Sequence, residues 1–153
     1  MQLNKNDINQ LNRIERLKII NSITGIKPGN LIGTTSDEGV SNLAVFSSVV
    51  HLGSNPSLLG FVSRPRSKNA GHTLRNIKQN GVYTINHIHP GYAEKAHYTS
   101  VKFPENTSEF DACGFTEEYL NNFKAPFVKE SNFKIGMCLK EVIEIKLNGT
   151  VLV

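Results

Sequence analysis

The stretch GFVSRPRSKNAGHTLRNIKQNGVYTIN, residues 60–86, decides the fold because it contains a strand, a basic loop, a short helix and a second strand in direct succession. Residues 58–63 form a short apolar run that is long enough for a buried strand. Residues 70–80 have the spacing of an amphipathic helix, with Ala70, Leu74 and Ile77 on one face and Arg75 and Lys78 turned away from it. Gly81 is expected to end this helix, and residues 82–86 return to a strand.

Three cations, Arg64, Arg66 and Lys68, lie immediately before the predicted helix. The first turn of a helix already carries about half a positive charge, so a bound anion would relieve the repulsion. Free N–H groups of that turn, together with nearby side chains, suit a phosphate. The alternative is a solvated basic loop whose charges point outward. The polar side chains available for a phosphate are Ser63, Ser67, His72 and Thr73, and His72 has the alternative of an ordinary surface position.

The bulk composition is that of an ordinary globular protein. The chain has 153 residues with 39% hydrophobic side chains, which suits one domain, 1–153, with a sizeable core. The net charge of +4 is spread without a long basic run, so it does not by itself indicate a nucleic-acid partner. No apolar run approaches the length of a membrane span and no leader is evident, so we expect no membrane association and a cytoplasmic location. Cys113 and Cys138 are expected to be reduced thiols.

The N-terminal region predicts one helix over residues 7–20. Ile8, Leu11, Ile14 and Leu17 recur every three residues and form an apolar stripe, with Asn6 or Asp7 as the N-cap. We expect this stripe to pack across a sheet or the end of a barrel, or against a partner chain.

The next region predicts a hairpin of two strands, residues 31–36 and 40–50, joined by a turn in which Gly39 takes a positive φ. Neither face of the second strand is cleanly polar, so both faces are expected to be covered. Its small and hydroxyl-bearing residues would let a flat ligand approach the backbone, although ordinary sheet packing with hydrogen-bonded serines is the favoured explanation for this strand alone. Residues 51–57 are expected to form a loop.

The remainder of the chain predicts further strands with few helices. Residues 106–114 are expected to be irregular and residues 116–121 to form a helical turn. Residues 133–147 alternate as one or two strands, and Asn148-Gly149 is a turn signal leading into residues 151–153. This pattern favours a mostly β fold, a small β-barrel with helical decorations. No G-x-G-x-x-G motif or P-loop is present, which disfavours a Rossmann-type nucleotide site.

The sequence offers raw material for two kinds of catalytic site, a zinc centre and a serine hydrolase site. His87 and His89 lie on one face of a strand end and His97 could approach them, as three imidazoles do in zinc sites, but solvated histidines near a Pro-Gly turn are the simpler interpretation. No G-x-S-x-G motif supports serine hydrolysis. No metal ligand, general acid or nucleophile is therefore assigned.

A series of short segments has a familiar order and spacing: ITGIKP (23–28), GTTSDEGVSNLAVFS (33–47), RP (64–65), HTLRNI (72–77), YTIN (83–86), TS (99–100), SEF (108–110), GFT (114–116) and APFVKES (125–131). Through them the chain, from about residue 20 to its end, resembles the flavin reductase-like family, whose fold is the FMN-binding split β-barrel.

The resemblance implies a cofactor, a reaction and a set of binding residues. It implies FMN as cofactor, NADH or NADPH as the hydride donor, and a homodimer with the flavin near the subunit interface, while the flavin itself carries the chemistry. It implies that the isoalloxazine ring lies along residues 42–47 and that a second group of residues surrounds the phosphate. The implied ring contacts are Asn42, Ala44, Val45, Phe46 and Ser47, and the implied phosphate contacts are Ser63, Arg64, Lys68, His72 and Thr73.

The sequence departs from the family pattern in two places. The basic-acidic-Thr element before the helix is here KNAGHT (68–73), and the family continues beyond residue 153, so the C-terminal end is expected to be shortened or the barrel to be completed differently. The leading expectation is an FMN-dependent oxidoreductase, a flavin reductase. The alternatives are an FMN-binding module that stores or senses flavin without turnover, and a basic nucleic-acid-binding barrel, for which the sequence lacks interleaved aromatic and cationic side chains.

Overall fold

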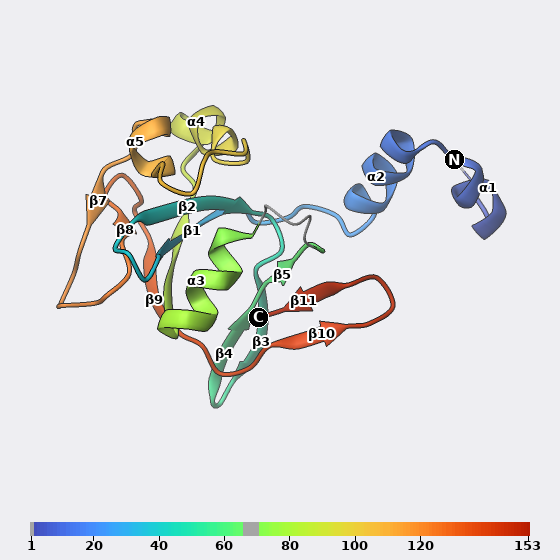
Figure 1. The fold of residues 1–153 in the computed structure, drawn as a ribbon. Coiled ribbons are helices and arrows are strands. Elements are labelled where there is room, and N and C mark those ends of the chain that lie inside the picture. The colour runs from blue at the N-terminus through green and yellow to red at the C-terminus, as the bar shows by residue number, and fades with distance from the viewer. Residues whose placement is uncertain (1, 66–70) are drawn as a thin grey trace.

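The computed structural model describes residues 2–65 and 71–153 and is centred on an antiparallel sheet of four strands (Figure 1). The strand order is β2 (Ser41–Phe46), β1 (Asn30–Thr35), β6 (Val82–His87) and β9 (Lys134–Cys138). The predicted hairpin is confirmed: β1 pairs with β2 from Asn30↔Phe46 to Thr35↔Ser41, and Gly39 in the connecting turn has φ +84°. In this sheet β2 is an edge strand.

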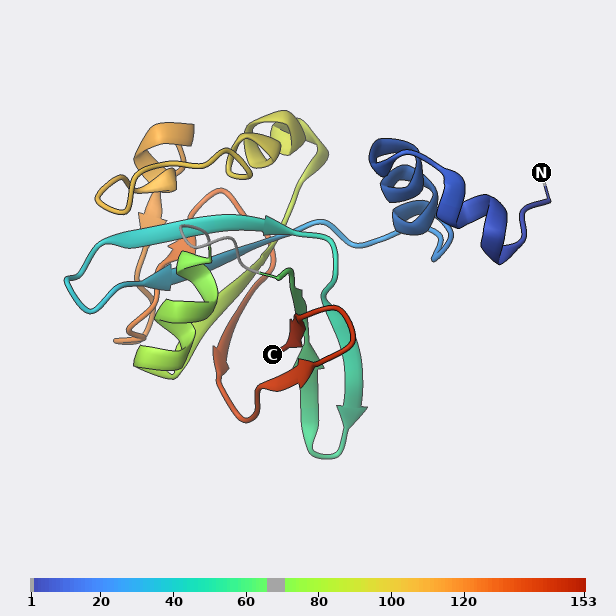
Figure 2. The same cartoon turned by 45° about the vertical axis from the view of Figure 1, so that its right-hand side comes forward.

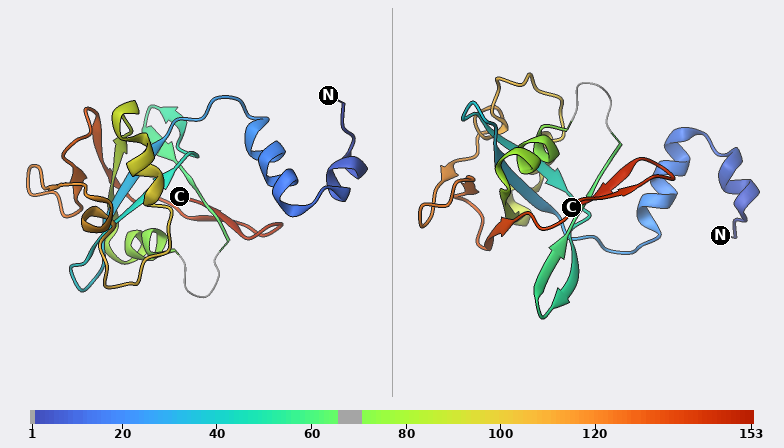
Figure 3. Two further views of the ribbon diagram at one scale, coloured as in Figure 1. Left: turned by 90° about the horizontal axis from the view of Figure 1, so that it is seen from above. Right: turned by 60° about the horizontal axis from the view of Figure 1, so that its bottom comes forward.

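Shorter strands extend the fold beyond this sheet. Val153 exchanges two backbone hydrogen bonds of 3.0 Å with Phe61, which closes the C-terminal end of the described chain onto the segment before α3. Figure 3 shows two hairpins, β3–β4 and β10–β11, projecting beyond the four-stranded sheet. The shorter strands are β3 (Val50–Ser54) with β4 (Ser57–Gly60), β5 (Val62–Ser63) with β11 (Thr150–Leu152) and β10 (Ile143–Ile145), and β7 (Glu117–Glu118) with β8 (Phe127–Val128).

Helices cover both faces of the main sheet, and Figure 1 shows α3 (His72–Asn80) on one side of β2 with α4 (Ala93–Tyr98) and α5 (Glu109–Cys113) on the other. A 3-10 turn, η1 (Pro90–Tyr92), precedes α4.

Successive strand residues point to opposite faces, and each face has its own core. Ile32 packs with Leu74 and Ile77 of α3, whereas its neighbour Leu31 packs with Ala96 and Phe110 of α4 and α5. Phe46 joins the first core and Leu43 the second, which confirms that both faces of β2 are covered.

The helix predicted over residues 70–80 forms as α3 but begins at His72. Ala70, also expected on its apolar face, lies outside the described residues. Leu74 and Ile77 are buried against the sheet, with exposed fractions of 3% and 0%. Gly81 ends the helix with φ +71°, and its N–H donates to the Ile77 carbonyl at 2.8 Å. The residue at this position has a positive φ, which glycine adopts more readily than other residues. Gly81 therefore marks the end of the helix in the sequence for a physical reason.

The N-terminal helix predicted over residues 7–20 is instead two helices, α1 (Lys5–Gln10) and α2 (Arg13–Ser22). The cap of α1 is Asn4 rather than Asn6 or Asp7. Asn12 has an extended backbone, and its side chain accepts hydrogen bonds of 3.0 Å from the N–H groups of Ile14 and Glu15. This side chain therefore interrupts the predicted helix and caps the start of α2. Neither helix buries a residue, and Figure 2 shows both standing clear of the sheets, so the expected packing against a sheet or barrel end is not observed.

Four other local expectations are corrected by the structure. The strand expected over residues 40–50 ends at Phe46, because Ser48 Oγ binds both the N–H and the carbonyl of Val62, at 3.1 and 3.0 Å. The loop expected over residues 51–57 contains most of β3 and the start of β4. The helical turn expected over residues 116–121 contains β7, which pairs with β8, and the region 106–114 contains α5, capped by Ser108.

No helix within residues 2–65 and 71–153 has both the length and the apolar character needed to cross a membrane.

Candidate functional site

The outer edge of β2 is the first component of the candidate site. The Leu43 N–H donates to Glu109 Oε2 at 3.0 Å, so this residue directs its backbone away from β1 and toward the edge. Backbone groups two residues apart in a strand point the same way, and Val45 occupies the equivalent position in the register with β1. Among the described residues no side chain hydrogen-bonds to the Val45 main chain. Its N–H and carbonyl are therefore available to a ligand at the edge.

The N-terminus of α3 is the second component. Gly71 precedes the helix with φ +111°, and no side chain of the described residues caps the first turn. Thr73 in that turn is buried, and its Oγ1 accepts a hydrogen bond from Asn42 Nδ2 at 3.2 Å. This bond joins the first turn of α3 to β2. An uncapped helix N-terminus presents free N–H groups and a partial positive charge, which favour an anion.

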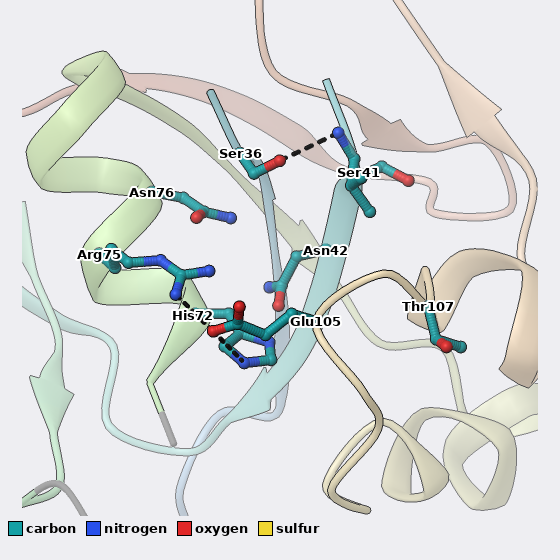
Figure 4. Close-up of a pocket in the computed structure, with 9 residues that line it drawn as sticks. Ser36, Ser41, Asn42, His72, Arg75, Asn76, Glu105 and Thr107 are labelled. Carbon is teal, nitrogen blue, oxygen red and sulfur yellow. Dashed lines mark hydrogen bonds and ion pairs between the residues drawn. The ribbon is translucent and has the colours of Figure 1, made fainter. Parts of the chain in front are cut away.

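A small polar pocket lies between α3, the start of β2 and the loop before α5 (Figure 4). Arg75 Nη1 donates to Glu105 Oε1 at 2.6 Å, and His72 Nε2 lies 3.7 Å from the same oxygen. The hydrogen bond from Arg75 and its charge hold the pKa of the Glu105 carboxyl below its ordinary value. The residues that line the pocket are Ser36, Val40, Ser41, Asn42, His72, Arg75, Asn76, Glu105 and Thr107.

Asn76 is the one described residue with a buried side-chain polar atom that lacks a hydrogen-bond partner. The side chain is 1% exposed; its Nδ2 donates to Thr34 Oγ1 at 3.2 Å, while Oδ1 is unpartnered and the residue lines the pocket. Buried amide oxygens are nearly always hydrogen-bonded in proteins. The pocket therefore offers an acceptor that a donor group or a water molecule would satisfy.

A second carboxylate, Glu109, lies on the other side of β2. It is only 7% exposed, and burial raises the pKa of its carboxyl, whereas the Leu43 N–H and the charge of nearby His72 act in the opposite direction. Next to it, Ser41 Oγ contacts Ser108 Oγ at 2.6 Å and donates to Glu117. These contacts fasten α5 and β7 to the start of the edge strand.

The structure brings together only part of the set of residues implied by the resemblance. Asn42, His72 and Thr73 lie together at the first turn of α3. Ala44 and Phe46 share the face of Asn42, Val45 lies on the other face, and Ser47 follows the strand and is exposed. Ser63 is in β5, where it pairs with Val151, and Arg64 is exposed just beyond it. Lys68, like Arg66 and Ser67, lies outside the described residues.

Among the pocket residues that sequence reasoning missed are Arg75, Asn76 and Glu105. Arg75 was expected to point away from the helix's apolar face, and it does so, but toward a loop that is distant in the sequence. A polar side chain at position 76, between the buried positions 74 and 77 of an amphipathic helix, was the available signal for a buried amide. Nothing local marks Glu105.

The histidines considered for zinc serve other contacts. The His87 ring packs on Phe133 with centroids 4.6 Å apart, and His89 Nδ1 accepts a hydrogen bond from the Gly91 N–H at 3.0 Å. Within residues 2–65 and 71–153, no three or more His, Cys, Asp or Glu side chains are grouped so as to hold a metal ion.

Comparison with known proteins gives the family. The model of the flavin reductase like domain matches residues 24–153. The chain belongs to the flavin reductase-like family. The resemblance stated from short segments of the sequence is thereby confirmed, and the family match covers both the β2 edge and α3.

Solved structures show that this family member has the split-barrel fold. A proposed flavin reductase with a split barrel domain from Shewanella frigidimarina is 45% identical, covers 99% of this chain and 75% of its own, and superposes with a TM-score of 0.92. Component B of nitrilotriacetate monooxygenase from Bacillus cereus, at 20% identity, covers 99% and 77% of the two chains with a TM-score of 0.85, which shows a shared fold. An uncharacterized protein of Aquifex aeolicus is 27% identical over 129 residues, 84% of this chain. The chain spans 66% of the length of that curated relative.

Proposed function

We propose that the chain is the catalytic part of a flavin reductase that binds FMN and takes hydride from NADH or NADPH. The observation that carries the proposal is the juxtaposition, through the Asn42–Thr73 hydrogen bond, of an edge strand with open backbone groups and an uncapped helix N-terminus. The family match supports a flavin as the ligand. When bound, FMN supplies the hydride acceptor, and the protein supplies binding, orientation and electrostatics.

The β2 edge fits the ring of the flavin. The ring has a polar edge of alternating hydrogen-bond donors and acceptors, which the N–H and carbonyl of Val45 complement. Asn42, Ala44, Phe46 and Ser47 would complete this wall, with Phe46 held in place by Phe61, 4.9 Å away between ring centroids. A flavin ring at this edge is oriented by hydrogen bonds to the main chain. Side-chain substitutions along β2 would therefore alter how the ring packs more than how its polar edge is recognised.

The start of α3 fits the phosphate of the flavin. His72 and Thr73 are in its first turn, and Ser63 and Arg64 lie in and just after β5, which precedes it in the chain. We include Lys68 in this set from its place in the sequence. Exposed Arg64 would donate charge-assisted hydrogen bonds to the phosphate. No proton transfer is assigned to these side chains: their role is to bind and orient.

We further propose that the protein is a homodimer. The support is α2, whose Ile14, Leu17 and Ile20 are 66%, 48% and 44% exposed and recur at helical spacing. An apolar stripe of this kind is typical of a helix that packs on a partner. Two free cysteines and a nicotinamide donor fit a reducing, cytoplasmic setting.

An anaerobic titration tests the reductase proposal. Purified protein is loaded with FMN and NADH or NADPH is added while the flavin absorbance is followed. The proposal expects the absorbance to bleach far faster than in a solution of free FMN and the same donor. Binding of FMN without accelerated bleaching would indicate instead a module that stores or senses flavin, and no binding at all would remove flavin from the account.

A further inference from the structure

The polar pocket beside α3 is closed by a carboxylate from a distant part of the chain. Glu105 lies 30 residues beyond Arg75, in the loop before α5, and reaches both Arg75 and His72 (Figure 4). Its side chain is 67% exposed, whereas those of Arg75 and His72 are 39% and 20% exposed. The Glu105 carboxylate therefore lies on the solvent side of the pocket and can leave Arg75 and His72 without disturbing a core.

The same pocket contains a group that Glu105 does not satisfy. Asn76 Oδ1 is buried, has no partner among the described residues and belongs to the pocket lining. A carboxylate has no hydrogen to donate, so it cannot supply this oxygen with a donor. A singly protonated phosphate group has both properties that the lining calls for: negative oxygens for Arg75 and His72, and a P–O–H donor for the Asn76 oxygen.

We propose that Arg75, His72 and Asn76 form a subsite for a phosphate group, and that Glu105 is a built-in competitor that occupies Arg75 and His72 when no phosphate is bound. The inference rests on the proposed function only in that His72 is shared with the flavin phosphate site. The ion pair with Glu105 weakens phosphate binding, because an arriving phosphate must first displace a carboxylate. A site of this design binds and releases its ligand readily instead of retaining it.

The effect of the competitor sets the size of the expected change. The Arg75–Glu105 pair is largely solvated, and pairs of this kind are only weakly stabilising, so Glu105 competes only weakly with phosphate. Removing the competitor should tighten phosphate binding about two- to five-fold, while removing Arg75 should weaken it by about ten-fold.

Thermal unfolding of the flavin-free protein in the presence of inorganic phosphate tests the proposal. The midpoint is measured against phosphate concentration at constant ionic strength, for the wild type, Glu105→Gln, Arg75→Gln and the control Glu144→Gln, which removes the same charge from an exposed position in β10. The proposal expects Glu105→Gln to lower the half-saturating phosphate concentration, Arg75→Gln to raise it, and Glu144→Gln to leave it unchanged. Equal half-saturation for wild type and Glu105→Gln, or an equal gain from Glu144→Gln, would overturn it; Glu105→Gln alone decides if Arg75→Gln does not fold.

Comparison of ligands then identifies the source of the phosphate. If the flavin phosphate occupies the subsite, Glu105→Gln tightens the binding of FMN and leaves that of riboflavin unchanged. If a nucleotide phosphate occupies it, the same variant tightens NADPH relative to NADH. Because the measurement with inorganic phosphate involves no flavin, its result stands even if the protein proves not to bind FMN, so failure of the subsite and failure of the flavin proposal are distinguishable.

Discussion

Replacement of Asn86 by alanine should be among the most destabilising single changes in the chain. Asn86 is fully buried in β6, where its Nδ2 donates to the Leu31 carbonyl at 3.1 Å and to Thr84 Oγ1 at 2.9 Å. Its Oδ1 accepts the Val128 N–H at 3.0 Å. One side chain thus joins β6 to β1 and to β8, the strand that brings β7 to the edge of the candidate site.

The magnitude follows from these three bonds. Alanine leaves the buried Val128 N–H without an acceptor, which costs about 1–3 kcal/mol, and forfeits two further bonds worth about 1 kcal/mol each. We therefore expect Asn86→Ala to lower the free energy of unfolding by about 3–5 kcal/mol. The matched control is Asn132→Ala, an exposed asparagine, which should change the free energy of unfolding by less than about 0.5 kcal/mol.

Urea unfolding followed by far-ultraviolet circular dichroism measures both variants, since the chain has no tryptophan. A loss below about 1 kcal/mol for Asn86→Ala, with an unchanged denaturant dependence, would show that the three bonds do not hold these strands together.

Three further predictions concern packing and titration. Gly33→Ala would place a Cβ against the Pro126 carbonyl oxygen and 2.6 Å from Thr84 Oγ1, so we expect a loss of about 1–3 kcal/mol in urea unfolding, whereas Gly53→Ala, with 3.5 Å to its nearest neighbour, should be nearly neutral. Burial raises the pKa of Glu109 above its ordinary 4.5, so the folded state holds the carboxyl proton more tightly than the unfolded state does. The stability associated with this proton is lost as the pH rises through the folded pKa. Glu109→Gln should abolish that part of the pH dependence of unfolding, and an unchanged profile would contradict the assignment. Burial also raises the pKa of Tyr83 to about 12, so a spectrophotometric titration should lose its latest phenolate transition in Tyr83→Phe, and loss of an earlier one instead would refute this.

The parts of the fold that the sequence predicted are those with local causes. The helix α3 follows from its apolar spacing and from Gly81, and the β1–β2 hairpin from the turn ending at Gly39. The break between α1 and α2 also has a local cause, the capping side chain of Asn12. The prediction missed it because the apolar spacing continues through this position and favours a single helix. By contrast, β7 forms because it pairs with β8, and no pattern within residues 116–121 indicates this pairing.

The candidate site divides in the same way. The position of His72 and Thr73 in the first turn of a helix was predictable from its apolar spacing, although the helix begins at residue 72 and not at residue 70. The ion pair between Arg75 and Glu105 was not, because it joins residues 30 positions apart through a loop without regular structure. The roles of Ser63, Arg64, Lys68 and the β2 residues in flavin binding remain predictions.

The most direct test of the central claim compares FMN and riboflavin as ligands of the wild type and of Arg64→Gln. Affinities are measured by quenching of flavin fluorescence at low ionic strength, where exposed charges are least screened. The account predicts that Arg64→Gln weakens FMN binding by roughly 1–3 kcal/mol and leaves riboflavin binding unchanged, because only FMN carries the phosphate. Equal affinities of the wild type for FMN and riboflavin, or an FMN affinity indifferent to Arg64, would contradict a phosphate held at the start of α3.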